Sequence, residues 1–151
     1  MAQWKYPVGQ ERFKTIAPVV TEAFSIDFGG AASTCTTAIK TYDAGTLMLG
    51  FAGIIREAAE SATTGTMQFG LTGTVLLTSA LSSGAMTVGD YIAPAVSNED
   101  NLPLLLRSDD TFDVIGATTI MTAGKVDMYV TYIPLPKTAL DTNVFQVYVT
   151  T

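Results

Sequence analysis

The feature that most restricts the fold of this chain is a pair of short apolar segments interrupted by glycine at matching positions. Residues 45–55 read GTLMLGFAGII and residues 65–75 read GTMQFGLTGTV, so a Gly-Thr start and two further glycines recur twenty residues apart. Short apolar runs bounded by turn residues favour strands. We therefore predict two related strands in one sheet, with glycine at a bend, a bulge or a close backbone approach at Gly50, Gly53, Gly70 and Gly73.

Further strands are predicted on both sides of this pair. Apolar and polar residues alternate in residues 24–28 and again in residues 125–135, where Val126, Met128 and Val130 share one face with Tyr132. The other predicted strands cover residues 35–42, 86–94, 102–106, 114–117 and 144–150. This succession of short strands predicts an all-β single domain, a small barrel or a sandwich.

Two stretches have a less regular pattern. Residues 54–60 contain Ala and Glu, which favour helix, so they form either one or two helical turns or the outgoing arm of a hairpin. Residues 123–125, Ala-Gly-Lys, indicate a hairpin turn. The domain therefore contains at most one short helix.

Charge is scarce and unevenly distributed. Charged residues make up 15% of the chain and threonine alone contributes 23 of the 151 residues. Residues 1–20 carry three basic side chains and one acidic one, a net charge of +2, whereas residues 21–151 have a net charge of −8. We predict an extended N-terminal arm, residues 1–20, on a β-rich domain, residues 21–151, because Pro7, Gly9 and Pro18 disfavour helix in the arm.

The arm also concentrates residues suited to contact with another molecule. Its aromatic and basic side chains are Trp4, Lys5, Tyr6, Arg12, Phe13 and Lys14. Such an arm either contacts another molecule, or lies as a strand or loop on its own domain.

The composition excludes several function classes. The chain has no histidine and one cysteine, Cys35, which removes most zinc sites, Ser-His-Asp and Cys-His catalysis, and any disulfide within the chain. Small buried cysteines are common, so Cys35 is interpreted as a core residue. Eight basic side chains are too few for a general nucleic-acid surface, and no segment has the length of a membrane span or the pattern of a secretory signal. These observations predict a soluble chain with no nucleic-acid or membrane partner.

Candidate chemical motifs are weak. Asp43-Ala44-Gly45 resembles the Asp-Thr/Ser-Gly of aspartic proteases, but its middle residue differs and the tripeptide reads as a turn. Residues 116–125, GATTIMTAGK, lack the first glycine and the final Ser or Thr of a phosphate-binding loop. The acidic loop residues are the remaining candidates, as oxygen ligands for a hard cation: Asp90, Glu99, Asp100, Asp109, Asp110 and Asp113. No catalytic residue, cofactor site or metal site is assigned.

The order of the glycine-containing segments resembles the small capsid decoration (cement) proteins of tailed bacteriophages. The segments are AGTLMLGFAGIIREAA (44–59), FGLTGTV (69–75), MTVGDYIAP (86–94), FDVIGAT (112–118) and VDMYVTYIPL (126–135). They include two more glycines at equivalent places, Gly89 in the Val-Gly-Asp turn and Gly116 in the Ile-Gly-x-Ala segment.

This resemblance implies a barrel-like or β-tulip body without cofactor, commonly a homotrimer on the outer face of the capsid. It implies that the major capsid protein and further copies of the chain are the partners, and that neighbouring capsomers are bridged. The arm residues named above would then contact the capsid or a neighbouring subunit. The protein would be made in the host cytoplasm and end in the virion.

Two alternatives remain open. The chain could be a receptor- or glycan-binding β module of a phage fibre or surface protein, using the aromatic residues Trp4, Tyr91, Tyr129, Tyr132 and Tyr148. It could also be a small hydrolase using Asp43 or the 109–113 loop, which ranks last because no histidine base is available.

Overall fold

A computed structural model describes residues 18–30, 35–61, 63–96, 101–117 and 119–135, without the side chain of Cys35. The arm residues Trp4, Lys5, Tyr6, Arg12, Phe13 and Lys14 therefore lie outside the described residues, as does the predicted strand at residues 144–150. Of the arm, only Pro18, Val19 and Val20 are described, and Val20 already begins the first strand.

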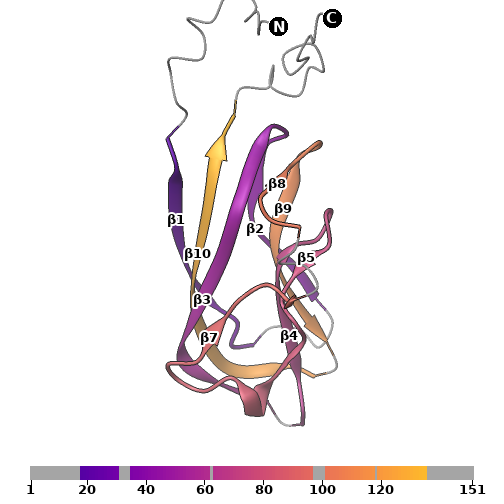
Figure 1. Cartoon of the computed structure of the whole chain (residues 1–151). Helices are drawn as coiled ribbons and strands as arrows, with labels where there is room; N and C mark the ends of the chain where they lie inside the picture. The colour runs from indigo at the N-terminus through magenta and orange to yellow at the C-terminus, as the bar shows by residue number, and fades with distance from the viewer. Residues whose placement is uncertain (1–17, 31–34, 62, 97–100, 118, 136–151) are drawn as a thin grey trace, which may run out of the picture.

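The described residues form two antiparallel sheets. In chain order the strands are β1 (Val20–Asp27), β2 (Cys35–Tyr42), β3 (Thr46–Ser61), β4 (Thr66–Leu71), β5 (Leu76–Leu77), β6 (Leu81–Ser82), β7 (Tyr91–Ile92), β8 (Leu104–Leu105), β9 (Asp110–Ala117) and β10 (Met121–Pro134), with a 3-10 turn, η2 (Ser83–Ala85), before β7. The first sheet has the order β1-β10-β3-β7, with β8 also on β3, and the second has the order β2-β9-β4-β5, with β6 also on β4. The predicted all-β fold is confirmed (Figure 1).

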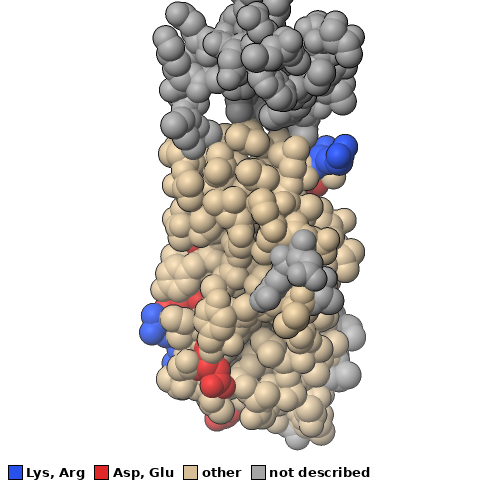
Figure 2. Space-filling model, viewed as in Figure 1, with Lys and Arg blue, Asp and Glu red and all other residues tan. Residues whose placement is uncertain are grey.

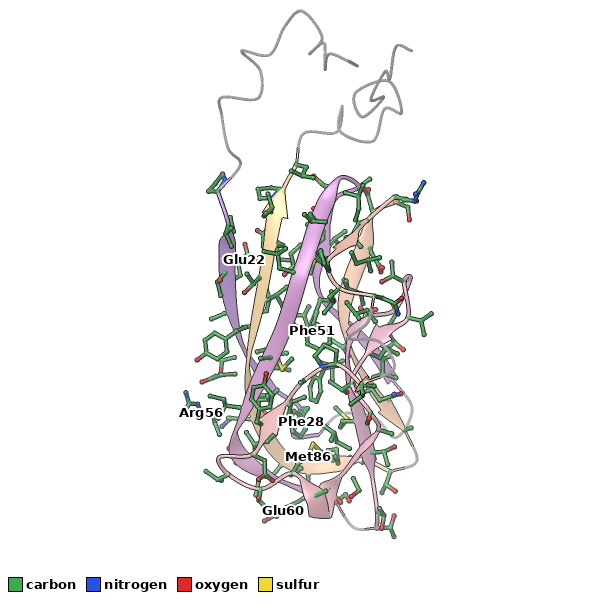
Figure 3. All side chains as sticks on the ribbon, viewed as in Figure 1. Glu22, Phe28, Phe51, Arg56, Glu60 and Met86 are labelled. Atoms are coloured by element: carbon green, nitrogen blue, oxygen red, sulfur yellow. The ribbon has the colours of Figure 1, made fainter. Side chains whose placement is uncertain are left out.

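One apolar core lies between the two sheets. Phe112 of β9 is fully buried, and its ring meets Phe24 of β1 at 6.5 Å and Phe51 of β3 at 5.2 Å between centroids. Phe28 contacts Phe69 of β4 in an edge-to-face arrangement at 6.0 Å. Figure 3 shows Phe28, Phe51 and Met86 inside the molecule, whereas Arg56 points outward. These aromatic contacts join the sheets across the core and add to the free energy of burial.

Strand β3 changes its buried face at Gly50. Before this point Thr46 and Met48 are buried, and after it Phe51, Gly53 and Ile55 are buried. The pairing with β10 shifts at the same place, because Thr131 faces Gly50 but Tyr132 faces Met48, which leaves Leu49 as the extra residue of a bulge. Leu47 and Leu49 are therefore only half-buried.

The helical interpretation of residues 54–60 is wrong. These residues continue β3 to Ser61 and pair with β10 as far as Met121. The hairpin alternative is also wrong, because the next strand, β4, belongs to the other sheet. Pairing with β10 and burial of Ile55 and Ala59 outweigh the small helix propensity of Ala and Glu.

The two glycine-spaced segments are not neighbours in one sheet, which corrects a second prediction. Residues 46–55 lie in β3 of the first sheet, and residues 66–71 form β4 of the second. Residues 72–75 form a turn, so Val75 is 66% exposed although its equivalent, Ile55, is fully buried. The similar sequences reflect similar strand starts, and the chain between them passes from one sheet to the other.

The C-terminal strand pattern is confirmed, but the turn within it is not. Val126, Met128 and Val130 of β10 are fully buried, as the alternation predicts. Residues 123–125 lie inside β10 at a series of register shifts rather than in a hairpin turn. Gly124 has a φ of +142°, and a Cβ there would lie 2.1 Å from the Phe28 ring, so a bulge packed against that ring takes the place of the turn.

Several predicted strands are shorter than expected, and one matches throughout. Strand β2 has the predicted bounds, residues 35–42. Strand β7 contains only Tyr91 and Ile92, and β8 only Leu104 and Leu105. Among the described residues β8 pairs only with β3, in keeping with the edge position that Pro103 indicates.

Gly70 offers a test of this packing. Its φ is +140°, and an added Cβ would lie 2.1 Å from the backbone oxygen of Leu76 in the paired strand β5. We expect Gly70→Ala to lower the free energy of unfolding by about 2–3 kcal/mol, because backbone cannot yield as a side chain does. Gly84→Ala is the control: an added Cβ there meets no atom within 4 Å and should change stability by less than about 0.5 kcal/mol in urea unfolding.

Val75 offers a second test, in which the substitution is expected to raise the free energy of unfolding. It has a φ of +58°, which is strained for a β-branched residue, and its side chain is 66% exposed. We expect Val75→Asn to raise the free energy of unfolding by about 0.5–1 kcal/mol, because Asn tolerates the left-handed conformation and little apolar burial is lost. Val88→Asn, at an equally exposed valine without positive φ, should leave stability unchanged. Equal effects in the two variants would contradict the strain at Val75.

Candidate functional site

A cluster of polar and aromatic side chains lies near the end of the two sheets from which both terminal segments leave. It consists of Glu22 of β1, Lys40 and Tyr42 of β2, and Tyr132 of β10. Figure 1 shows the start of β1 and the end of β10 side by side at this end. The cluster joins the edge strand of one sheet to the edge strand of the other.

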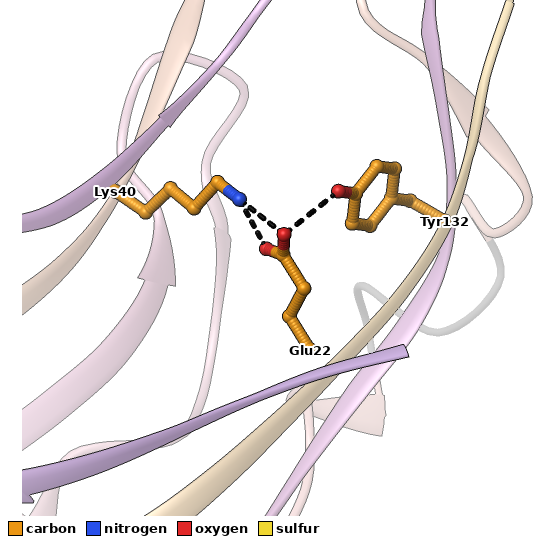
Figure 4. A network of polar contacts seen from close by, with 3 residues as sticks. All are labelled: Glu22, Lys40 and Tyr132. Atoms are coloured by element: carbon orange, nitrogen blue, oxygen red, sulfur yellow. Dashed lines mark hydrogen bonds and ion pairs between the residues drawn. The ribbon is translucent and has the colours of Figure 1, made fainter. Parts of the chain in front are cut away.

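Glu22 is the centre of the cluster (Figure 4). Its carboxylate accepts hydrogen bonds from the Lys40 ammonium on both oxygens, and Tyr132 Oη donates to Oε1 at 3.0 Å. Lys40 Nζ also lies 5.4 Å from the centroid of the Tyr42 ring and 5.9 Å from that of Tyr132. The two tyrosine rings meet edge to face at 5.1 Å. The lysine is therefore held by one carboxylate and two aromatic faces.

The environment shifts the proton equilibria of the cluster. Burial alone would raise the pKa of Glu22, but the hydrogen bonds from Lys40 and Tyr132 outweigh it and lower that pKa. Burial, reinforced by the charge of Glu22, raises the pKa of Tyr42 far above its ordinary value. Burial and the bond to Glu22 also raise the pKa of Tyr132. These shifts keep the Glu22 carboxylate ionised and the two phenols neutral around neutral pH.

A pocket of about 240 Å³ opens beside the cluster. Lys40, Tyr42 and Tyr132 form one wall, and Asp43 and Leu135 belong to the rest of the lining. The Tyr42 hydroxyl is buried without a hydrogen-bond partner. The pocket therefore adjoins the point where the chain continues toward its C-terminal segment, and the arrangement suits a packing or docking role.

Several acidic residues proposed for catalysis or cation binding accept hydrogen bonds that hold turns in place. Asp109 accepts the backbone N–H of Ala44 at 2.8 Å, next to Asp43 in the turn after β2. Asp110 accepts the N–H of Gly73 at 2.9 Å, and Asp113 accepts the hydroxyl of Thr72 at 2.5 Å. Within the described ranges no group of three or more His, Cys, Asp or Glu side chains could hold a metal ion.

The other predicted acidic residues do not extend this group. Asp90 accepts the backbone N–H of Thr87 at 2.9 Å in a separate turn. Glu99 and Asp100 lie outside the described residues.

The predicted glycines lie at distinct places. Gly50 is at the β3 bulge, and Gly53 faces Met128 and Val126 so closely that an added Cβ would lie 2.3 Å from the Met128 sulfur. Gly70 approaches β5, and Gly73 lies in the turn held by Asp110. Gly89 has a φ of +92° in the turn before β7, and Gly116 is buried in β9.

Most basic side chains in the described part of the chain form ion pairs with acidic ones. Of its four basic side chains, Lys40, Arg56 and Lys125 form ion pairs, with Arg56 Nε 2.7 Å from Asp127 and Lys125 Nζ 3.0 Å from Glu57. Figure 2 shows one face of the molecule with mostly uncharged side chains and few charged ones. This part of the surface therefore offers no basic patch for nucleic acid.

The sequence did not reveal the Glu22–Lys40–Tyr42–Tyr132 cluster. Glu22 and Lys40 are 18 residues apart on strands of different sheets, and Tyr132 is 110 residues from Glu22. The only available signal was the half-buried alternation of β10, which placed Tyr132 on the inner face.

No described helix is long and apolar enough to cross a membrane.

The fold has counterparts among solved structures. A chain in the structure "Capsid of Ralstonia phage GP4" superimposes with a TM-score of 0.52 at 11% identity, over 89% of this chain and 92% of that one. A chain in "Cyanophage Pam1 capsid asymmetric unit" gives a TM-score of 0.49 at 17% identity, over 78% of this chain and 85% of that one. No protein-family model and no curated protein matches the sequence. The GP4 match shows that this two-sheet fold is shared with that chain.

The ion pair of the cluster can be tested by charge removal. We expect Glu22→Gln to lower the free energy of unfolding by about 1 kcal/mol near neutral pH, because Lys40 loses its partner while half-buried. Glu57→Gln, which removes an exposed pair with Lys125, should cost less than about 0.5 kcal/mol. Urea unfolding of both variants is the measurement.

The pH dependence of stability in the same variants tests whether the charge of Glu22 stabilises the fold. Because the folded pKa of Glu22 is lowered from 4.5, its contribution is complete above 4.5 and disappears as the pH falls through the folded value. The stability difference between wild type and Glu22→Gln should therefore shrink on acidification below 4.5. A difference that stays constant down to full protonation would contradict the role of the Glu22 charge.

Proposed function

We propose that this protein is a non-enzymatic capsid protein of a tailed phage, a decoration protein that binds the outer surface of the head. In this proposal it bridges neighbouring copies of the major capsid protein and assembles as a homotrimer. The observation that carries the proposal is the match to a chain of the Ralstonia phage GP4 capsid over nearly the full length of both chains.

The charge distribution supports an assembly role. In the described part, three of the four basic side chains are already neutralised within the chain, and much of the visible surface is uncharged. Uncharged surface can be covered by another protein without the desolvation cost of burying unpaired charge.

The chemistry of the described acidic residues supports a structural role over hydrolysis. Asp109, Asp110 and Asp113 accept hydrogen bonds that fix the turns after β2 and β4, and the half-buried Glu22–Lys40 ion pair joins β1 to β2. A hydrolase would need a carboxyl or another group with a proton equilibrium matched to its reaction. The shifts at Glu22, Tyr42 and Tyr132 instead hold each group in one protonation state around neutral pH.

The N-terminal segment is assigned the capsid contact. It combines Trp4, Tyr6 and Phe13 with Lys5, Arg12 and Lys14, whereas the rest of the chain is acidic. Aromatic and basic side chains together supply apolar contact area and attraction to an acidic shell. Three copies of such a segment on one trimer would bind with avidity even if each contact is weak.

Co-sedimentation with capsids tests the proposal. Full-length protein at micromolar concentration is mixed with undecorated capsids of the same virus, and we expect it to pellet with them. A variant that lacks residues 1–17 is the comparison, because this deletion leaves β1 intact from Val20. We expect the variant to retain its β-sheet circular dichroism and to bind capsids at least tenfold more weakly.

The two arms of the experiment give separate answers. If the full-length protein stays in the supernatant at saturating capsid concentration, the capsid role is wrong. If both proteins bind equally well, the capsid role stands and the N-terminal segment is not the attachment site.

A further inference from the structure

The outer face of the first sheet carries two tyrosines that are not buried. Because Met128 of β10 is fully buried, its neighbour Tyr129 points to the opposite face of the sheet, where its side chain is half-buried. Tyr91 of β7 is 70% exposed. Both belong to the aromatic residues that the sequence suggests for a glycan-binding module, whereas Tyr132, a third candidate, lies in the cluster around Glu22.

Strand pairing places these two tyrosines on one continuous surface, the tyrosine platform. Directly paired residues point to the same face of a sheet. The platform consists of three such rows: Ser25, Asp127, Ile54 and Tyr91; Ala23, Tyr129 and Ala52; and Thr21, Thr131 and Gly50. All of these residues are exposed or half-buried. The first row crosses four strands spaced about 4.8 Å apart, so the platform is about 14 Å wide.

The two rings are open to a ligand and well separated. Tyr129 is paired on both sides with alanine, Ala23 of β1 and Ala52 of β3, and a methyl group is too short to cover the faces of its ring. Tyr91 and Tyr129 are two strands and one row apart, which separates their Cα atoms by about 12 Å. A ligand that contacts both rings must therefore be an extended molecule with more than one apolar face.

A polar group lies beside these rings. Arg56 Nε donates to Asp127 Oδ2 at 2.7 Å, and Figure 3 shows Arg56 pointing away from the core. The Arg56 side chain is 53% exposed, so most of its N–H donors remain available, as do lone pairs of the Asp127 carboxylate. Hydrogen bonds from Arg56 and Ser25 lower the pKa of Asp127, which keeps the carboxylate ionised around neutral pH.

These groups match a carbohydrate better than a nucleic acid or a protein. The C–H face of a sugar ring packs against an aromatic ring, and its hydroxyl groups bond to ionised donors and acceptors. Asp127 neutralises Arg56, so the platform offers no net positive charge to phosphate. Ile54 is the single large aliphatic side chain in the three rows, whereas the centre of a protein interface is more apolar.

We propose that the tyrosine platform binds a neutral glycan chain, with Tyr91 and Tyr129 stacked on two of its sugar rings and the Arg56–Asp127 pair bonded to its hydroxyl groups. The acidic body of the protein disfavours an acidic glycan. Because both rings lie on one open sheet face, the matching chain is extended, as β-1,4-linked sugars are, rather than coiled. This binding is additional to the proposed capsid role and does not depend on it.

Titration calorimetry with three neutral hexasaccharides tests the proposal on the full-length protein. The probes are cellohexaose and chitohexaose, which are extended, and maltohexaose, which coils. We expect at least one of the extended chains to bind with a dissociation constant below about 1 mM, and maltohexaose to bind at least about tenfold more weakly. Absence of binding by both extended chains overturns the proposal, and equal binding of maltohexaose overturns the assignment to an extended chain.

Substitutions at Tyr91 test the stacking. We expect Tyr91→Ala to weaken binding at least about tenfold and to keep the wild-type melting temperature, because the side chain is largely exposed. Tyr91→Phe retains the ring and should bind within about twofold of wild type. Val96→Ala, at a 79% exposed residue beside β5 of the second sheet, is the matched control and should bind as wild type does. Unchanged binding in Tyr91→Ala would contradict the site.

A second matched pair tests the polar group. Asp127→Asn keeps the shape of the side chain but removes the charge that holds Arg56, so we expect binding to weaken about fivefold or more. Glu57→Gln removes the carboxylate paired with Lys125, outside the platform, and should leave binding unchanged. Equal losses in the two variants would show a general effect of charge and overturn the assignment to Asp127.

Capsid co-sedimentation separates this proposal from the proposed function. Tyr91→Ala should pellet with capsids as the wild type does. If it does not, the platform is a protein interface and the glycan assignment is wrong. A wild-type protein that binds an extended hexasaccharide but no capsid contradicts the proposed function alone.

Discussion

The pairing of β3 with β10 is the interaction on which the rest of the structure depends. These are the two longest strands described, and β10 also carries β1 while β3 carries β7 and β8. Both strands contain bulges, at Gly50 and around Gly124, that change which face is buried. Without these shifts, Met48 and Phe51 could not both face the second sheet, because a strict alternation places them on opposite faces. The core around Phe112 therefore depends on two local irregularities in one ladder.

The scarcity of charge has a structural counterpart. Three of the four described basic side chains form ion pairs within the chain: Lys40 joins the two edge strands through Glu22, and Arg56 and Lys125 neutralise carboxylates on the first sheet. The buried carboxylates Asp110 and Asp113 fix the turn after β4 to β9. Within the described residues these charged groups connect the chain's own elements, and much of the visible surface is uncharged (Figure 2).

One end of the molecule concentrates the features relevant to assembly. The ion-pair cluster, the pocket at Leu135 and the departure of both terminal segments lie together there. The Glu22–Lys40 pair joins β1 to β2, the edge strands of the two sheets, at this end. The proposed attachment segment therefore begins beside this cluster.

The sequence by itself determined the all-β class, the bounds of β2 and the inward face of β10, because these depend on alternation over neighbouring residues. It also determined the separation of a basic N-terminal segment from an acidic body. Only the tertiary structure decided that the two glycine-spaced segments lie in different sheets, that residues 54–60 remain a strand, and that Glu22, Lys40, Tyr42 and Tyr132 meet. Sheet membership is fixed by which distant strands pair and by the core they enclose, and a bulge reverses the buried face within one strand. Neither sheet membership nor the position of a bulge can be read from neighbouring residues, because glycine occurs both at bulges and in turns.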